Sequence, residues 1–308
     1  MKLQHLVARA ADKTHFRTLE DYAGFAQAFL DYVADHLQAV IVSRNEPHYN
    51  FWQFKADGHF NITRPINSNL MFTAEEGGNF RRRFLDVLGN LRETASDTPS
   101  NRECVNRSIY TLQQCIGAAL DALPSGQSNT ARKINGDLFE RLIQLLLVRL
   151  GVNCSSATVK VPVVVKGQVT FHMSYQHDLV IKEGEWVRII GSVKTSSKDR
   201  LDKIFVDKFL FAKLTGSQVP HIAIFLNDVQ RKNTANPREY GVNSTFLPGH
   251  FKGYTVKLNP LDGVYYFDLR PNMRNDALLQ KHIKTFDHFV FGDLWRLLKS
   301  PVMVAKVK

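Results

Sequence analysis

The fold is decided by residues 186–229, which read WVRIIGSVKTSSKDRLDKIFVDKFLFAKLTGSQVPHIAIFLNDV. Residues 186–194 predict a strand, and 196–216 predict a helix with a serine at its N-cap and a glycine at its end. Residues 221–229 are almost continuously apolar, as expected for a buried parallel strand. Strand, helix and strand in this order form a βαβ unit. The stretch therefore predicts an α/β fold.

A β-hairpin precedes this unit. Two β-rich runs, TVKVPVVVK and VTFHMSYQHDLVI, come before a tight turn at residues 182–185 that leads into the strand at 186. A helix over 134–151 stands before the hairpin and ends at Gly151. Residues 230–308 add a short β region around GVYYFDLRP and a helical stretch to about residue 299. The central sheet is therefore expected to be mixed and flanked by helices.

The first 125 residues are predicted to be mainly helical, because apolar residues recur with a helical period in 17–40, 77–94 and 104–122. A polar, aromatic-rich loop is expected over 45–65. The segment PSGQSNTARK at 124–133 has the composition of a linker. The predicted organisation is a helical region over 1–125 and an α/β core with a C-terminal extension over 126–308.

Composition excludes several classes of protein. The 308 residues include 40 Lys and Arg against 29 Asp and Glu, and 44% are hydrophobic. A packed core is therefore expected, and the excess of +11 points to a polyanionic partner such as nucleic acid. Three cysteines without a CxxC pair suggest a reducing cytosol and no zinc ribbon. Without an apolar run long enough for a signal or a membrane span, a cytoplasmic protein with no membrane partner is expected.

Polar residues that could carry chemistry concentrate between 137 and 208. Asp178 comes toward the end of one strand, and Ser192 and Lys194 close the next. With a three-residue turn centred near Gly184, Asp178 lies opposite Ile190 and shares a face with Ser192 and Lys194. A one-residue change in the turn would reverse that face.

Two further acids stand on helices, Glu140 before the hairpin and Asp207 thirteen residues after Lys194. Carboxylates at strand ends bind Mg²⁺ through oxygen, and a lysine beside them can orient an attacking water and stabilise charge on a phosphodiester. Each residue alone has an ordinary explanation, such as a turn residue, a solvated helix face or an Asp207–Lys203 surface pair. The order Glu, Asp, S-x-K, acid is far more specific.

That order resembles the active site of the PD-(D/E)xK nucleases, in particular the NgoMIV- and EcoRII-like type II restriction endonucleases that cut CCGG, CCNGG or CCWGG. The resemblance covers roughly residues 137–210. In this group the middle acid moves from the strand to the next helix. The resemblance implies that Asp178 and Asp207 bind metal with support from Glu140, that Lys194 acts on the water, and that Ser192 is auxiliary. His177 stands where the motif has Pro, and Asp207 where many members have Glu.

Three further sites are candidates for DNA contact. Lys198-Asp199-Arg200 resembles the (R/K)-(D/E)-R triplet with which this group reads CC:GG, in the first turn of a helix; the alternative is an ordinary charged turn. Trp52 is a candidate for stacking a flipped nucleotide, as some CCNGG-type members do, or else a core residue. The run Arg81–Arg83 contacts phosphate or is a solvated helix face.

The resemblance implies a Mg²⁺-dependent restriction endonuclease acting on a palindromic duplex DNA site with CC and GG, CCNGG-like, with TCCNGGA as a more specific hypothesis. Such a site implies a homodimer with one active site per strand. The region 1–125 would then serve DNA contact or dimerisation. The alternatives are a structure-selective repair nuclease of the same fold and a non-catalytic basic DNA-binding protein. A dinucleotide-dependent enzyme is disfavoured, because no GxGxxG loop follows a strand.

Overall fold

The computed structural model describes residues 2–56, 59–198, 200–236 and 239–300. Contacts divide the chain into two compact units. The first comprises the residues up to Leu145 with Asp228–Thr245, and the second comprises Leu146–Asn227 with the residues from Phe246 onward. The division falls inside helix α5 (Ser128–Arg149), whereas the sequence placed a boundary at 125/126.

The second unit is built on a six-stranded mixed sheet with the order β12-β11-β8-β7-β6-β5. The strands β5, β6 and β7 pair antiparallel, and β7, β8, β11 and β12 pair parallel, which confirms the predicted mixed α/β sheet. The bounds are β5 Cys154–Val165, β6 Gln168–Glu183, β7 Trp186–Ser196, β8 His221–Asn227, β11 Gly263–Tyr266 and β12 Ile283–Thr285.

The predicted βαβ unit consists of β7, helix α6 (Leu201–Thr215) and β8. Every residue of β8 is buried, and Gly216 ends α6 with a φ of 65°, both as predicted. The predicted helix start at residue 196 is wrong. Parallel pairing continues as far as Ser196 opposite Asn227, so Ser196 is held in extended backbone, and the N-cap of α6 is Arg200.

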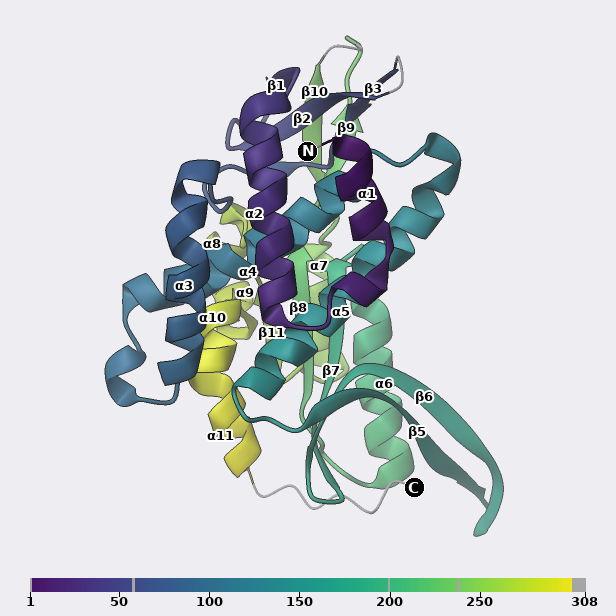
Figure 1. The fold of residues 1–308 in the computed structure, drawn as a ribbon. Coiled ribbons are helices and arrows are strands. Elements are labelled where there is room, and N and C mark those ends of the chain that lie inside the picture. The colour runs from purple at the N-terminus through teal and green to yellow at the C-terminus, as the bar shows by residue number, and fades with distance from the viewer. Residues whose placement is uncertain (1, 57–58, 199, 237–238, 301–308) are drawn as a thin grey trace. The chain divides into compact units, whose positions relative to one another are not determined.

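Helix α6 covers one face of this sheet (Figure 1). Its first half buries Phe205 in a cluster with Ala223 and Phe225 of β8. Its second half buries Phe211 in another cluster, with Val180 of β6 and Ile190 of β7. These two clusters show that Val180, Ile190, Ala223 and Phe225 point toward α6.

A β-bulge in β6 changes the alternation of its side chains. Between the pairs Ser155–Val180 and Ala157–His177, β5 advances two residues and β6 advances three, so β6 holds one extra residue around Asp178 and Leu179. His177 and Val180 therefore both face α6 although they are three positions apart: the His177 ring contacts Phe211, and Val180 belongs to the same cluster as Phe211. A strict period of two would have placed them on opposite faces.

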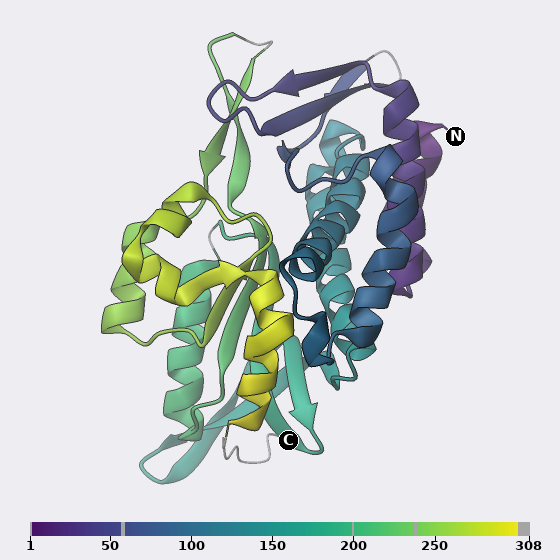
Figure 2. The same ribbon diagram turned by 90° about the vertical axis from the view of Figure 1, so that its left-hand side faces the viewer.

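The remaining elements of the second unit are short helices toward the C-terminus, as predicted up to residue 299 (Figure 2). One turn of π-helix, Phe289–Asp293, links two of them. The helices are α7 Pro248–Lys257, α8 Pro271–Asn275, α9 Ala277–His282, α10 Phe286–His288 and α11 Leu294–Lys299.

The first unit contains the three helices predicted for the N-terminal region, which are α2, α3 and α4, and two further helices, α1 and most of α5. The helices are α1 Leu3–Ala11, α2 Leu19–His36, α3 Ala74–Asn90, α4 Pro99–Leu120 and most of α5. Thr18 and Thr73 open α2 and α3 with capping boxes. The linker predicted at 124–133 is wrong, because α5 begins at Ser128. Its polar residues from Ser128 to Lys133 lie in the exposed first turns of that helix.

Two small sheets complete the first unit and were not predicted. Residues 45–65 were expected to form a loop, but hold two strands, and the aromatic residues Tyr49, Phe51, Trp52 and Phe54 of the first strand are buried. Tyr49 and Phe51 form a core cluster with Val229 and Val242, which a later segment of the chain contributes. The strands are β1 Ala39–Val42, β2 Tyr49–Ala56, β3 His59–Ile62, β4 Ile66–Asn67, β9 Val229–Asn233 and β10 Tyr240–Ser244.

Candidate active site

Asp178 and Lys194 meet across the hairpin of β6 and β7. Nζ of Lys194 lies 2.7 Å from Oδ2 of Asp178, and the backbone N–H of Val193 donates to the same oxygen at 2.9 Å. The Asp178 side chain is 16% exposed and that of Lys194 is 30% exposed, so the pair is sheltered but reachable. Two donors thus fix one carboxylate oxygen.

The expected pairing of Asp178 with Ile190 is wrong, since Val180 lies opposite Ile190. The turn has two residues rather than three, and β7 holds an extra residue beside Ile181. Together these shift the register by two residues. Because a shift of two preserves the face of every side chain, Asp178 and Lys194 still meet.

Ser192 and Lys194 face α6. Ser192 pairs with Ala223 and Lys194 with Phe225, the two β8 residues that pack beneath the first half of α6. Ser192 is half-buried. The strand ends therefore present a carboxylate, a hydroxyl and an ammonium on the side of the sheet that α6 covers.

Asp207 reaches this side of the sheet from α6. Its side chain is 23% exposed, and Lys203, one turn earlier, lies 3.9 Å from its Oδ2. Burial raises the pKa of the Asp207 carboxyl, and Lys203 only partly offsets the rise. Burial and the Asp207 charge also raise the pKa of Tyr175 on β6. Asp207 is therefore a sheltered carboxylate with one weak counter-ion.

His177 is a packing residue between these groups. Its ring lies 6.4 Å from Phe211 and 6.0 Å from Tyr175, centre to centre. Burial lowers its pKa to about 4, while Asp178 acts in the opposite direction. The imidazole is neutral at neutral pH. His177, which stands where the motif has Pro, therefore adds no charge to the site. Sequence reasoning missed the packing of Tyr175 and His177, although the alternation from Phe171 to His177 shows that they share a face.

The donor set suits a hard cation. Mg²⁺ commonly takes one or two protein carboxylates and completes its shell with water and substrate phosphate. Asp178 on β6 and Asp207 on α6 are two sheltered carboxylates whose chemistry fits this requirement. The described residues hold no group of three or more His, Cys, Asp or Glu suited to a metal ion. Glu140 lies half-buried on α5 in the first unit, and its support of the site stays a prediction.

The candidate base-reading residues lie between β7 and α6. Lys198 and Arg200 are exposed, and Asp199 lies outside the described residues. The backbone N–H of Lys198 donates to Oγ of Ser196 at 3.2 Å. The triplet therefore precedes the helix instead of forming its first turn, because α6 starts at Leu201.

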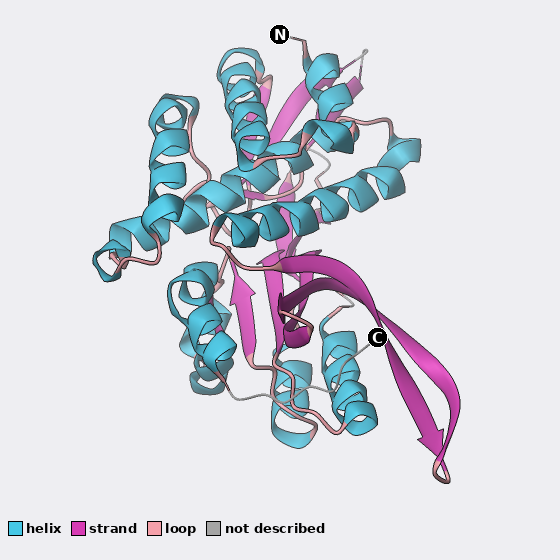
Figure 3. Ribbon diagram, turned by 60° about the horizontal axis from the view of Figure 1, so that its bottom comes forward, coloured by secondary structure: helices cyan, strands magenta, loops and turns pink. Residues whose placement is uncertain are grey.

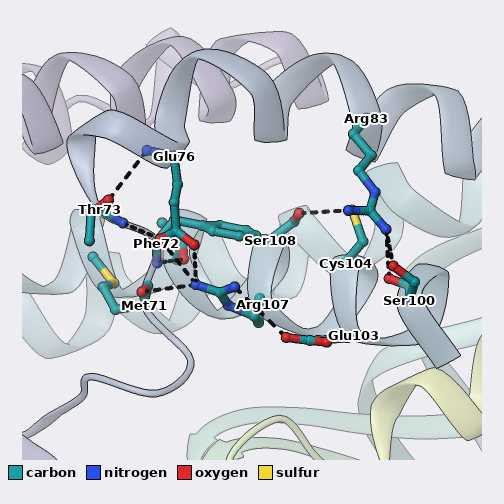
Figure 4. Close-up of polar contacts among 11 residues, drawn as sticks. Met71, Phe72, Thr73, Glu76, Arg83, Ser100, Glu103, Cys104, Arg107 and Ser108 are labelled. Carbon is teal, nitrogen blue, oxygen red and sulfur yellow. Dashed lines mark hydrogen bonds and ion pairs between the residues drawn. The ribbon is translucent and has the colours of Figure 1, made fainter.

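The two N-terminal candidates have different surroundings. Trp52 is 9% exposed in β2, and its ring stacks on Phe29 of α2 at 6.2 Å. Its ring therefore lies within the core of the first unit. Residues 81–83 are exposed on α3, where Arg83 donates to the backbone oxygen of Ser100 at 3.2 Å (Figure 4). Arg82 and Arg83 line a cleft of about 360 Å³ with Asn79, Asp86, Val87, Asn90, Ser96 and Asn101.

Within the described ranges, no helix is both long and apolar enough to cross a membrane. No protein-family model and no curated protein matches the chain. Among solved structures, the type IIP restriction endonuclease Kpn2I is similar, with a TM-score of 0.67 and 15% identity over 96% of this chain and 97% of that chain. The PspGI restriction endonuclease–substrate DNA complex matches with a TM-score of 0.42 and 11% identity, over 71% of this chain and 92% of that one. The chain has the fold of a type IIP restriction endonuclease.

Proposed function

We propose that this protein is a Mg²⁺-dependent type II restriction endonuclease that hydrolyses phosphodiester bonds in duplex DNA at a palindromic site containing CC and GG. The observation that carries the proposal is the meeting of Lys194 and Asp178 at 2.7 Å on the sheet face that also receives Asp207. A lysine paired with one sheltered carboxylate, and a second sheltered carboxylate on the helix that covers the same sheet face, match the needs of phosphodiester hydrolysis in a restriction endonuclease fold.

Each residue has a distinct task in this proposal. Bound Mg²⁺ would neutralise charge that builds on the phosphate in the transition state. Asp178 and Asp207 would hold it, and the Val193 N–H, at 2.9 Å, keeps the Asp178 carboxylate oriented. Lys194 would donate to the attacking water and to the phosphate oxygen. Ser192 would add a hydroxyl, and Glu140 would support the metal-binding residues.

Base readout is assigned to the exposed cations that follow β7. Lys198 and Arg200 can donate to guanine O6 and N7, and Asp199 can accept from cytosine amino groups. We expect a CCNGG-like site, with TCCNGGA as the extended form. A palindrome requires a two-fold homodimer, to which residues 1–125 would contribute DNA contact or dimerisation surface. Flipping of a central base onto Trp52 would require that ring to leave its stack on Phe29.

The decisive test is cleavage of plasmid DNA by the purified protein in Mg²⁺ and, separately, in EDTA, with sequencing of the ends. Discrete fragments that share a CC…GG end in Mg²⁺ alone support the proposal. Cleavage at branches or nicks without base preference would point to a repair nuclease with the same site. If Mg²⁺ produces no cleavage at any salt concentration, both nuclease functions are excluded.

A substitution separates a catalytic role from a structural one. Asp178→Ala should abolish cleavage and retain specific binding, measured in Ca²⁺ by the retention of a labelled duplex. If specific binding is lost as well, Asp178 is structural. Specific binding by a wild-type protein that never cleaves would support the non-catalytic DNA-binding alternative.

A further inference from the structure

The strands β5 and β6 extend beyond α6 as a two-stranded arm, defined here as residues 160–174. Figures 1 and 3 show it projecting past the end of the helix. Its tip is a two-residue turn at Lys166 and Gly167, both with positive φ, 51° and 82°. Such turns match the right-handed twist of the strands that they join. The arm is thus a regular hairpin.

The tip of the arm exposes a group of large apolar side chains. Val164, Val165, Val169 and Phe171 are 52–56% exposed. An isolated two-stranded hairpin has marginal stability in water, and clustered apolar exposure marks an interaction surface. Val159, Val161 and Tyr175, at the base of the arm, belong to the cluster beneath α6. Phe171, which pairs with Val163, continues the anchored face of Val159 and Val161 toward the tip, where apolar side chains are uncovered.

Charge indicates which partner the arm fits. No Asp or Glu occurs between Glu140 and Asp178, a stretch of 37 residues in a chain with 29 acids in 308. At the average density about three or four acids would be expected there. The arm itself carries Lys160, Lys166 and His172, all exposed. A surface that exposes cations and carries no carboxylates is complementary to a polyanion.

The dimensions and side chains of the arm suit duplex DNA. A two-stranded ribbon fits the major groove. Lys160 pairs with Ser174, and Pro162 with His172, so one face offers donors for phosphates and bases. The apolar tip can contact sugars and thymine methyl groups. Gln168 and Asp178 are ten positions apart along β6, which corresponds to roughly 33 Å, or about one turn of B-DNA.

We propose that the arm is a DNA-binding element that follows a groove of the same duplex whose phosphodiester enters the Asp178–Lys194 site. This inference rests on the proposed function for the identity of the polyanion. Pairing of β5 with the β5 of a second copy is disfavoured. The strand lies at the edge of the sheet, but Pro162 lacks the N–H that such pairing needs.

The test is the double substitution Lys160→Glu/Lys166→Glu. Binding to a fluorescent 30-base-pair duplex is measured by anisotropy in Ca²⁺ at several salt concentrations. We expect at least tenfold weaker binding and a salt dependence reduced by about 2 in log–log slope, since each lost phosphate contact removes about 0.9. The matched control, Lys257→Glu/Lys281→Glu, changes two exposed lysines on α7 and α9 and should retain wild-type binding.

A shortened arm tests the apolar tip. Residues 163–171 are removed, with Pro162→Asn and His172→Gly as the new turn between Val161 and Met173, which already pair. We expect an unchanged melting temperature and oligomeric state, and weaker DNA binding. Wild-type affinity in both variants would overturn the proposal. A shortened arm that dissociates a dimer, with DNA affinity per dimer unchanged, would assign the arm to a second copy instead.

These outcomes stay separate from those of the cleavage test. A wild-type protein that binds DNA through the arm without cleaving it would refute the endonuclease function and support the arm as a DNA-binding element. A wild-type protein that cleaves, with arm variants that bind and cleave as well as it does, would refute only the arm. A wild-type protein that binds no DNA would refute both.

Discussion

Nζ of Lys194 and Oδ2 of Asp178 lie 2.7 Å apart, so the proposed catalytic lysine is also the counter-ion of the proposed metal ligand. The two roles oppose each other, because a cation bound by Asp178 competes with the ammonium for the same oxygen. Removal of the lysine should therefore affect catalysis and metal binding in opposite directions.

Lys194→Met keeps the length of the side chain and removes its charge. We expect single-turnover cleavage to fall by about 10²–10³, the usual loss for one donor to a developing negative charge. Mn²⁺ affinity, measured by calorimetry, should stay equal or increase. Lys213→Met, an exposed lysine of α6, is the control and should match wild type in both. Weaker Mn²⁺ binding by Lys194→Met would show that the lysine organises the site structurally.

Asp207→Asn should stabilise the fold and abolish cleavage. Because burial raises the folded-state pKa of Asp207 above its unfolded value, its favourable contribution is complete below the unfolded pKa and is lost as pH rises through the folded pKa. At pH 7.5 the charged form is therefore unfavourable, and an amide removes that cost. We expect a gain of about 0.5–2 kcal/mol in urea unfolding in EDTA. A loss of stability would mean that the Lys203 pair outweighs burial.

Acid should destabilise the second unit through two buried histidines. Burial lowers the pKa of His177 to about 4 and that of His221 to about 3. Their contribution is complete above the unfolded value near 6.5 and is lost as pH falls toward the folded values. Each adds a slope of up to about 1.4 kcal/mol per pH unit below 6.5.

His177→Phe retains the aromatic packing and should make urea stability less steep between pH 6 and 4.5. His5→Phe removes an exposed histidine of α1 and should leave the wild-type slope. If His177→Phe has the same pH profile of urea stability as His5→Phe, His177 does not contribute to the loss of stability in acid.

Gly117→Ala should destabilise the first unit although alanine favours helices. A Cβ at Gly117 would lie 2.5 Å from Nη1 of Arg64. The Arg64 guanidinium donates to both carboxylate oxygens of Asp121, at 2.9 and 2.8 Å, and its backbone N–H donates at 2.7 Å. Displacement of the guanidinium should cost about 2–4 kcal/mol in urea unfolding.

The control for that substitution is Gly89→Ala on α3, where a Cβ would meet nothing within 4 Å. Alanine should stabilise the protein there by about 0.5–1 kcal/mol. Equal effects at the two glycines would show that Arg64 adapts without loss.

Arg200→Ala should relax base discrimination more than it slows cleavage of poor sites. Loss of one bidentate guanine contact is worth about 1–3 kcal/mol of discrimination. The measurement compares cleavage rates for the preferred duplex and for single-base variants of it. Arg270→Ala, a cation at the N-cap of α8, is the control. A uniform loss on all duplexes would mean that Arg200 contacts only phosphate.

The sequence was most informative where local signals agreed. The apolar run at 221–229 and the glycine after α6 predicted a parallel βαβ unit, and the structure has it. The sequence placed Lys194 of the S-x-K strand correctly beside Asp178, although the predicted register was wrong. The shorter turn and the bulge in β7 each shift the register by one residue, and a total shift of two keeps both side chains on the same face. The bulge in β7 and the bulge in β6 each insert one residue into an otherwise alternating strand, and the sequence analysis predicted neither.

Other errors arose where distant parts of the chain complete an element. The aromatic residues 49–54 look like a loop when taken alone, because the strand that covers Tyr49 and Phe51 comes more than 170 residues later. The polar segment 124–133 looked like a linker, because an exposed helix start and a linker share the same composition.

The late contribution of β9 and β10 also limits how the protein can be made and divided. The first unit takes Asp228–Thr245 into its core, after the chain has completed strands β5 to β8 of the second. On the ribosome, Tyr49 and Phe51 remain uncovered until about four-fifths of the chain has been synthesised. A fragment that stops at residue 125 or 145 lacks Val229 and Val242, so the N-terminal region is not a module that can be excised or transplanted intact.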